Sequence, residues 1–99
     1  MFLFKKHIVK LNKLCTKYKV LNLYVFGSAV NNKFNASSDI DLLVTFDHVD
    51  LNDYADNYFD FKFSLEELFN KKIDLLEEKA IRNPFLKQSI DTSKELLYG

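Results

Sequence analysis

The sequence predicts a single α/β domain over residues 1–99, in which helices pack on a sheet of three or slightly more strands. Three short apolar runs rich in β-prone residues alternate with longer stretches whose apolar residues recur at helical spacing. A length of 99 residues allows one domain, and a hydrophobic content of 47% supplies one compact core without disulfides or a structural metal.

The first element is predicted as an amphipathic helix over residues 2–19. Its apolar residues recur three and four positions apart, with lysines on the opposite face: Leu3, Phe4, His7, Ile8, Leu11, Leu14, Cys15 and Tyr18. His7 and Cys15 lie on this apolar stripe. We interpret both as core residues, because the chain has no matching Cys or His pair to complete a metal site.

Three short strands are predicted at residues 21–26, 40–46 and 72–77. Gly27 ends the first strand, and Ser28 can cap a short helix over about residues 28–33. Asn and Ser residues then form a polar loop that leads into the second strand. Tyr24 is expected to pack within the first strand, and His48 is expected at the surface.

The second half of the chain returns to helical spacing at residues 51–69. Phe59 and Phe63 lie outside the apolar stripe of this helix. They are either contacts for a partner or packed under a neighbouring loop. Pro84 suits the first turn of a last helix, predicted to run to about Tyr98, so the expected order is α-β-α-β-α-β-α.

The remaining composition indicates a cytoplasmic chain with no membrane partner. Cys15 is the only cysteine, so no intramolecular disulfide can form and a reducing compartment is the natural reading. No apolar run approaches the roughly 20 residues of a membrane span, and the N-terminus lacks the apolar core of a signal peptide.

Charge is unevenly distributed, although the formal net charge is zero. Residues 1–19 contain six lysines and no acidic residue, so the rest of the chain is acidic. This basic arm is either a surface for an acidic partner or a solvated helix face. Nucleic acid is not expected as a partner, because the net charge is neutral and no arginine cluster exists.

Chemistry concentrates where the first strand ends and the second begins. Gly27 allows a sharp turn and the close approach of a phosphate, and Ser28 opens a helix whose free amides attract anions. Side chains alternate along a strand, so Asp39 and Asp41 are expected on one side. Two such carboxylates form a rigid oxygen site suited to Mg²⁺, and two metal ions can clamp the oxygens of a phosphoryl displacement.

Asp74 is predicted to complete this site. It lies in the third strand, between Ile73 and Leu75, with parity opposite to these core-facing residues. If the third strand neighbours the second, its carboxylate can project toward the same pocket. It could then also accept the proton of an attacking hydroxyl.

These residues carry a family resemblance. Gly27-Ser28, ten residues and then Asp39-Ile40-Asp41 resemble the signature of the DNA polymerase beta-like nucleotidyltransferase superfamily. The small size, Ile73-Asp74-Leu75 and the later Asn-Pro-Phe-Leu at 83–86 are similar to its minimal nucleotidyltransferase (MNT) branch.

The resemblance implies a mixed sheet of about three to four strands flanked by helices, two Mg²⁺ ions and ATP. A nucleoside monophosphate would be transferred to an acceptor hydroxyl. Asp39 and Asp41 would bind both metals, Asp74 would bind the catalytic metal, and Gly27 with Ser28 would hold the outer phosphates. It further implies a helical HEPN toxin as partner, with this chain as antitoxin and a tyrosine of the toxin as acceptor.

One departure from the family pattern leaves an alternative open. Relatives often place arginines after Gly-Ser, whereas residues 29–32 here are Ala-Val-Asn-Asn and the nearest cation is Lys33. A lysine offsets phosphate charge but cannot grip it bidentately. The alternative is an antitoxin that neutralises its partner by direct binding, with little or no catalysis.

Overall fold

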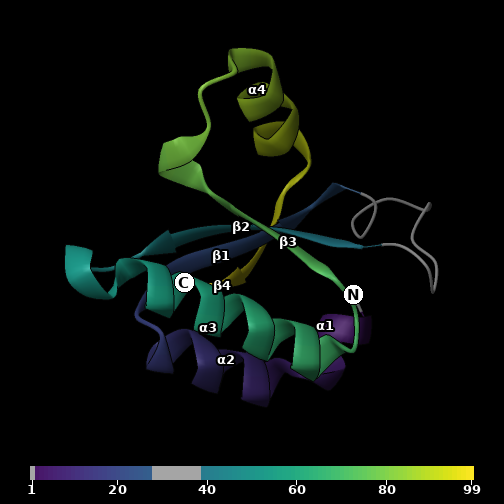
Figure 1. Ribbon diagram of the computed structural model, residues 1–99. Helices are drawn as coiled ribbons and strands as arrows, with labels where there is room; N and C mark the ends of the chain where they lie inside the picture. Colours follow the sequence, from purple (N-terminus) through teal and green to yellow (C-terminus); the bar gives the residue numbers. More distant parts are fainter. Residues whose placement is uncertain (1, 28–38) are drawn as a thin grey trace.

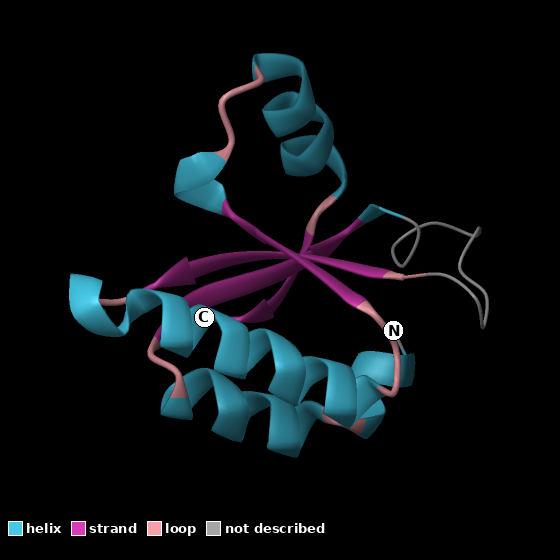
Figure 2. Ribbon diagram, viewed as in Figure 1, coloured by secondary structure: helices cyan, strands magenta, loops and turns pink. Residues whose placement is uncertain are grey.

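The computed structural model describes residues 2–27 and 39–99 of the chain. Its centre is a four-stranded mixed sheet in the order β3-β2-β1-β4 (Figures 1 and 2). The strands are β1 (Val20–Phe26), β2 (Ile40–Phe46), β3 (Ile73–Glu77) and β4 (Glu95–Tyr98). β1 pairs antiparallel with β2 and β4, whereas β2 pairs parallel with β3. The predicted mixed sheet flanked by helices is confirmed.

Helices cover the two faces of the sheet unequally. The helices α1 (Phe2–Lys6), α2 (Ile8–Lys17) and α3 (Leu51–Phe69) lie on one face, and α4 (Pro84–Ser93) lies on the other (Figure 1). A short 3₁₀ turn, η2 (Glu78–Ala80), joins β3 to the segment before α4. The short helix predicted at residues 28–33 lies outside the described residues.

The prediction of one continuous helix over residues 2–19 is wrong at His7. This residue separates α1 from α2 with backbone angles of −111° and 14°. The rings of Phe4 and His7 both meet Phe69 edge-on, at centroid distances of 5.4 and 5.5 Å. These contacts dock the break between the two helices against the end of α3.

The C-terminal segment also differs from the prediction. α4 ends at Ser93, and residues 95–98 form β4 instead of continuing the helix to Tyr98. The hydroxyls of Thr92 and Ser93 bond to the carbonyl of Ser89, and the chain then turns extended at Lys94. Pairing with the open edge of β1 satisfies backbone groups that a helix end would leave free.

The start of α4 agrees with the sequence. The Asn83 side chain accepts hydrogen bonds from the amides of Phe85 and Leu86, at 2.9 and 3.3 Å, and Pro84 occupies the first turn. An Asn cap followed by Pro suits a helix start because Pro lacks the amide that would need a partner.

The sheet separates two apolar clusters. The larger cluster lies between the sheet and α1–α3 and includes Leu11, Cys15, Leu42, Phe61 and Leu65. The smaller one, formed by Phe26, Leu43 and Ile90, joins the opposite face to α4. Cys15 is therefore a core residue, as predicted.

Among the described residues, no helix combines the length and apolar character needed to cross a membrane.

Candidate active site

The two strand aspartates lie on the sheet face that carries α4. Leu42 belongs to the cluster under α3, whereas Leu43 belongs to the cluster under α4. Side chains alternate along a strand, so Asp41 shares the face of Leu43. The same reasoning places Asp74 on the α4 face, because its neighbours Ile73 and Leu75 are buried in the larger cluster.

Register brings these two carboxylates to neighbouring positions. β2 and β3 are adjacent and parallel, and Asp41 is directly paired with Asp74. Adjacent strands lie about 4.8 Å apart, so the two side chains rise side by side from the same face. The condition stated for the third carboxylate, that its strand neighbours the second, is therefore met.

Electrostatics couples the three aspartates. Burial raises the pKa of the Asp41 carboxyl, and the negative charges of Asp74 and then Asp39 raise that pKa further. Asp39 is exposed and lies one residue before β2, with the same parity as Asp41. A cation placed among these groups would relieve the repulsion that the pKa of Asp41 records.

Gly27 lies against this cluster. Its φ of +71° is in the left-handed region, and a β-carbon at this position would overlap the carboxylate of Asp41. Phe26, one residue earlier, is paired with Asp41 across β1 and β2. Gly27 thus lies directly against the Asp41 carboxylate, and a side chain at this position would require that carboxylate to move.

The chemistry of the donor set fits a hard divalent cation. Carboxylate oxygens, which all three aspartates supply, are the ligands that Mg²⁺ prefers. Within residues 2–27 and 39–99, no three His, Cys, Asp or Glu side chains are gathered as tightly as a formed metal site requires. Asp39, Asp41 and Asp74 therefore lie near enough for their negative charges to interact, and their role as metal ligands is a proposal.

Two predicted nucleotide contacts, Ser28 and Lys33, lie outside the described residues. His48 is at the surface, with its side chain 97% exposed, as expected. Tyr24 packs in the cluster under α4, beneath the Lys94 ammonium, which lies 4.3 Å from its ring centroid. The expectation that Tyr24 is a packing residue is confirmed.

Phe26 is a neighbour of the site that the sequence did not single out. It is 9% exposed and contributes to the apolar cluster under α4. Its place directly before Gly27 was visible, but its proximity to Asp41 depends on the register of β1 and β2. No local sequence signal fixes that register.

Phe59 and Phe63 form an exposed pair on α3. They are 48% and 56% exposed, and their rings stack at a centroid distance of 6.0 Å. Phe59 also meets the ring of Tyr58 edge-on, at a centroid distance of 5.0 Å. About half of each side chain stays exposed, so contact with a partner and packing under a loop both stay predictions.

Comparison with known proteins agrees with this geometry. The family model described as polymerase beta nucleotidyltransferase matches residues 9–99. Two candidate protein adenylyltransferases of Methanocaldococcus jannaschii are 38% and 35% identical to the chain over 95 residues. Each alignment covers 94% of this chain and 92% of the relative.

Solved structures show the same fold. A candidate minimal nucleotidyltransferase superposes with a TM-score of 0.75 at 23% identity, covering 92% of this chain and 89% of its own. A toxin–antitoxin complex with AMP-PNP superposes with a TM-score of 0.70 at 24% identity, and the match covers 93% of this chain and 73% of the other. A complex of an MNT antitoxin with a tri-AMPylated HEPN toxin of Shewanella oneidensis superposes with a TM-score of 0.64 at 22% identity. The match covers 97% of this chain and 72% of the other. Since the family model spans nearly the whole chain and the relatives align along their length, this protein belongs to the polymerase beta nucleotidyltransferase family.

Proposed function

We propose that this nucleotidyltransferase is a magnesium-dependent protein adenylyltransferase that acts as a cytoplasmic antitoxin. It transfers AMP from ATP to a hydroxyl of a helical HEPN toxin, with a tyrosine as the acceptor. The observation that carries the proposal is the direct pairing of Asp41 with Asp74 on the sheet face next to Gly27.

The reaction is a displacement at the α-phosphorus of ATP. The acceptor oxygen forms a bond to this phosphorus while the bond to the bridging oxygen of pyrophosphate breaks. The hydroxyl proton passes to the Asp74 carboxylate, which lies at the exposed edge strand of the sheet. Magnesium, held by Asp39, Asp41 and Asp74, would offset the negative charge of the triphosphate and of the leaving pyrophosphate.

The remaining nucleotide contacts follow from the turn after β1. Gly27 keeps side-chain atoms away from the position where the outer phosphates approach, and its missing β-carbon leaves the Asp41 carboxylate in place. In this proposal the Ser28 hydroxyl and the Lys33 ammonium add donors for the same phosphates. Lys33 does so as a point charge, because it lacks the fork of an arginine.

The names of relatives and structural neighbours support a protein acceptor. The Methanocaldococcus relatives bear the name of protein adenylyltransferases, and one neighbour is an MNT antitoxin bound to an AMPylated HEPN toxin. A 99-residue domain has little room for both a nucleotide pocket and an elaborate acceptor site. A second protein that supplies the acceptor surface removes this difficulty.

A second candidate function is neutralisation by contact alone. The observation that favours it is the replacement of arginines after Gly-Ser by Ala-Val-Asn-Asn, which weakens the grip on a triphosphate. The retained carboxylates oppose it, because keeping three negative charges close together without a catalytic use lowers stability.

Intact-mass measurement separates the two candidates. The chain is incubated with Mg²⁺, ATP and the helical protein encoded beside it, and both masses are followed. A gain of one or more AMP groups on the partner supports the adenylyltransferase. Asp39→Ala combined with Asp41→Ala should abolish the gain and the neutralisation of toxicity. Neutralisation that survives in this variant, without any mass gain for the native chain, would favour contact alone.

A further inference from the structure

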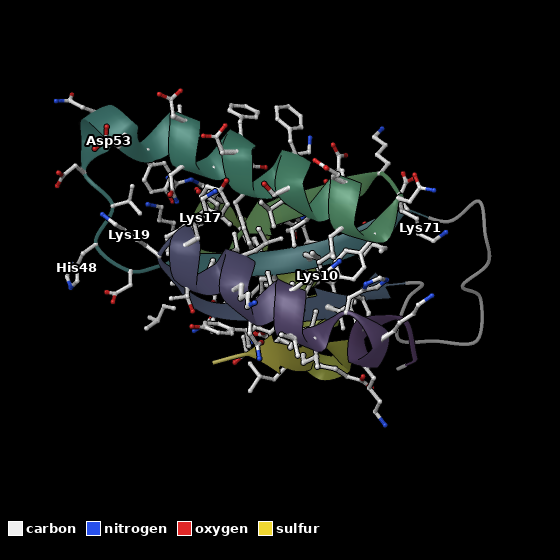
Figure 3. All side chains as sticks on the ribbon, turned by 90° about the horizontal axis from the view of Figure 1, so that it is seen from below. Lys10, Lys17, Lys19, His48, Asp53 and Lys71 are labelled. Atoms are coloured by element: carbon white, nitrogen blue, oxygen red, sulfur yellow. The ribbon has the colours of Figure 1, made fainter. Side chains whose placement is uncertain are left out.

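A cavity of about 230 Å³ lies at the end of the strands away from the aspartates. It is lined by residues of β2, α3, β3 and η2: Val44, Thr45, Phe46, Tyr54, Glu77, Glu78 and Lys79. In Figure 3, Asp53 and Lys71 mark opposite ends of α3. The lining residues Val44 and Glu77 are paired three positions further along β2 and β3 than Asp41 and Asp74, so the cavity and the aspartate cluster are separate sites.

The Tyr54 ring forms a fixed wall of this cavity. Its hydroxyl donates a hydrogen bond to the Glu77 carboxylate. The Phe46 ring meets it edge-on, at a centroid distance of 5.8 Å and an interplanar angle of 83°. One contact holds the hydroxyl and the other holds the ring plane, so the face of Tyr54 has a defined orientation.

A cation of the chain itself already uses this face. The Lys79 ammonium lies 4.2 Å from the centroid of the Tyr54 ring, in the range of a cation–π contact. Lys79 is exposed and belongs to the three-residue turn η2, and its long side chain can leave the ring without moving the backbone. The contact shows that the ring face accepts a positive charge, and another cation over this ring must first displace the Lys79 ammonium.

Two carboxylates complete the lining. Glu77 accepts the hydrogen bond from Tyr54 through one oxygen, and an ionised carboxylate can accept further donors. Glu78 accepts a hydrogen bond of 3.1 Å from Thr45 and lies 3.9 Å from the Lys87 ammonium. With Lys79 withdrawn, the cavity has an aromatic wall and two acidic groups.

We propose that this cavity is a binding site for the guanidinium group of an arginine from a partner protein. A planar guanidinium stacks on an aromatic face and donates hydrogen bonds in a fork to carboxylates, which an ammonium cannot do. It would take the place of Lys79 over Tyr54 and bond to Glu77. The charge of the lining selects a cation, and the proposal does not depend on the catalytic activity of the aspartate cluster.

Titration with N-acetyl-arginine amide tests the site. The resonances of the Tyr54 ring are followed by NMR and assigned by their loss in Tyr54→Phe. They should shift with the ligand, and Lys79→Ala should tighten binding roughly two- to five-fold by removing the internal competitor. Glu77→Gln should weaken binding several-fold.

Lys17→Ala is the matched control. Lys17 also lies over a tyrosine ring, at 5.2 Å from the centroid of Tyr18, but Tyr18 does not line this cavity. This variant should leave the affinity unchanged, and native chemical-shift dispersion in each variant confirms folding.

Three results would overturn the proposal. The first is an absence of shifts in both the native chain and Lys79→Ala. The second is an equal response to the uncharged N-acetyl-norleucine amide, which would mark an apolar cavity. The third is tighter binding of free agmatine than of the peptide N-acetyl-Ala-Arg-Ala amide, which would assign the site to a small amine.

Discussion

The carboxylate of Asp41 occupies the space that any side chain at Gly27 would need. Gly27 directly follows β1, whereas Asp41 is the second residue of β2. Their contact joins a residue proposed to lie near the phosphates to a carboxylate proposed to hold the metal. A substitution at either residue should therefore alter the conformation of the other.

Gly27→Ala is expected to lower stability and to displace Asp41. A non-glycine residue at a φ of +71° costs roughly 1–3 kcal/mol, and the overlap with the carboxylate adds to this cost. Urea unfolding measures the stability, and AMP transfer to the partner measures the effect on the site. Both should fall.

The double variant Gly27→Ala with Asp41→Ala separates the two causes. Shortening residue 41 removes the overlap but leaves the left-handed backbone. The destabilisation by Gly27→Ala should therefore be smaller in the Asp41→Ala background. Equal destabilisation in both backgrounds would show that the contact between positions 27 and 41 does not contribute to the free energy of unfolding.

Asp41→Asn should stabilise the fold at neutral pH while it removes activity. The folded pKa of Asp41 is raised, so the folded state holds its proton more tightly than the unfolded state does. Ionisation of Asp41 therefore lowers stability as pH rises from the unfolded pKa of 3.8 through the raised folded value. Urea unfolding at a series of pH values, without divalent cations, should show that Asp41→Asn is more stable than the native chain above this pH window. The two proteins should be equally stable below it.

Asp91→Asn is the matched control with the opposite sign. Hydrogen bonds from Lys94 and Lys87 lower the pKa of Asp91. Its charge therefore adds stability above the unfolded pKa, and this contribution is lost as pH falls through the folded value. The variant should be less stable than the native chain at neutral pH. A gain in stability for Asp91→Asn, or a loss for Asp41→Asn, would contradict the pKa directions.

Periodicity predicted the central strands and α3 because their residues are patterned by burial on the sheet. The ranges of β2 and α3, Ile40–Phe46 and Leu51–Phe69, agree with those expected from the sequence. β4 was missed for a different reason. Glu-Leu-Leu-Tyr has no helical or strand signature by itself, and its conformation is decided by the unpaired edge of β1.

The site shows the same division. Gly27, Asp39 and Asp41 could be singled out because they lie close together in the sequence, near the end of β1 and the start of β2. Asp74 needed the further assumption that β3 neighbours β2; the structure shows this pairing, and its direction is parallel. The contact of Gly27 with Asp41, and the cavity around Tyr54, depend on strand register and helix packing that a single sequence does not contain.

Cys15 should be almost inert to alkylation in the folded chain. Burial raises the pKa of its thiol from an ordinary value of 9.0 to about 12, so its thiolate fraction at pH 8 is about a thousandfold lower. Iodoacetamide labelling followed by intact mass should be slow in buffer and fast in urea. The chain has one cysteine, so every label reports this residue. Labelling of the folded chain at the rate of a free thiol would show that Cys15 is not enclosed.

Phe59 and Phe63 are expected to contact the helical partner. Their rings stack on the outer side of α3 and about half of each side chain is exposed. Replacing both by Ser should change the free energy of unfolding by less than about 1 kcal/mol, because little core area is lost. Binding to the partner, measured by calorimetry, should weaken at least tenfold if these rings lie in the centre of the interface.

Two controls define the result. Phe61→Ala, at the fully buried position between them, should cost about 3–5 kcal/mol of stability and shows what loss of a core ring does. Phe85→Ser removes another exposed ring, which is 80% exposed at the start of α4. If Phe85→Ser weakens partner binding as much as the α3 double variant, the interface is not centred on α3. If the double variant binds like the native chain, the exposed pair has no role in partner recognition.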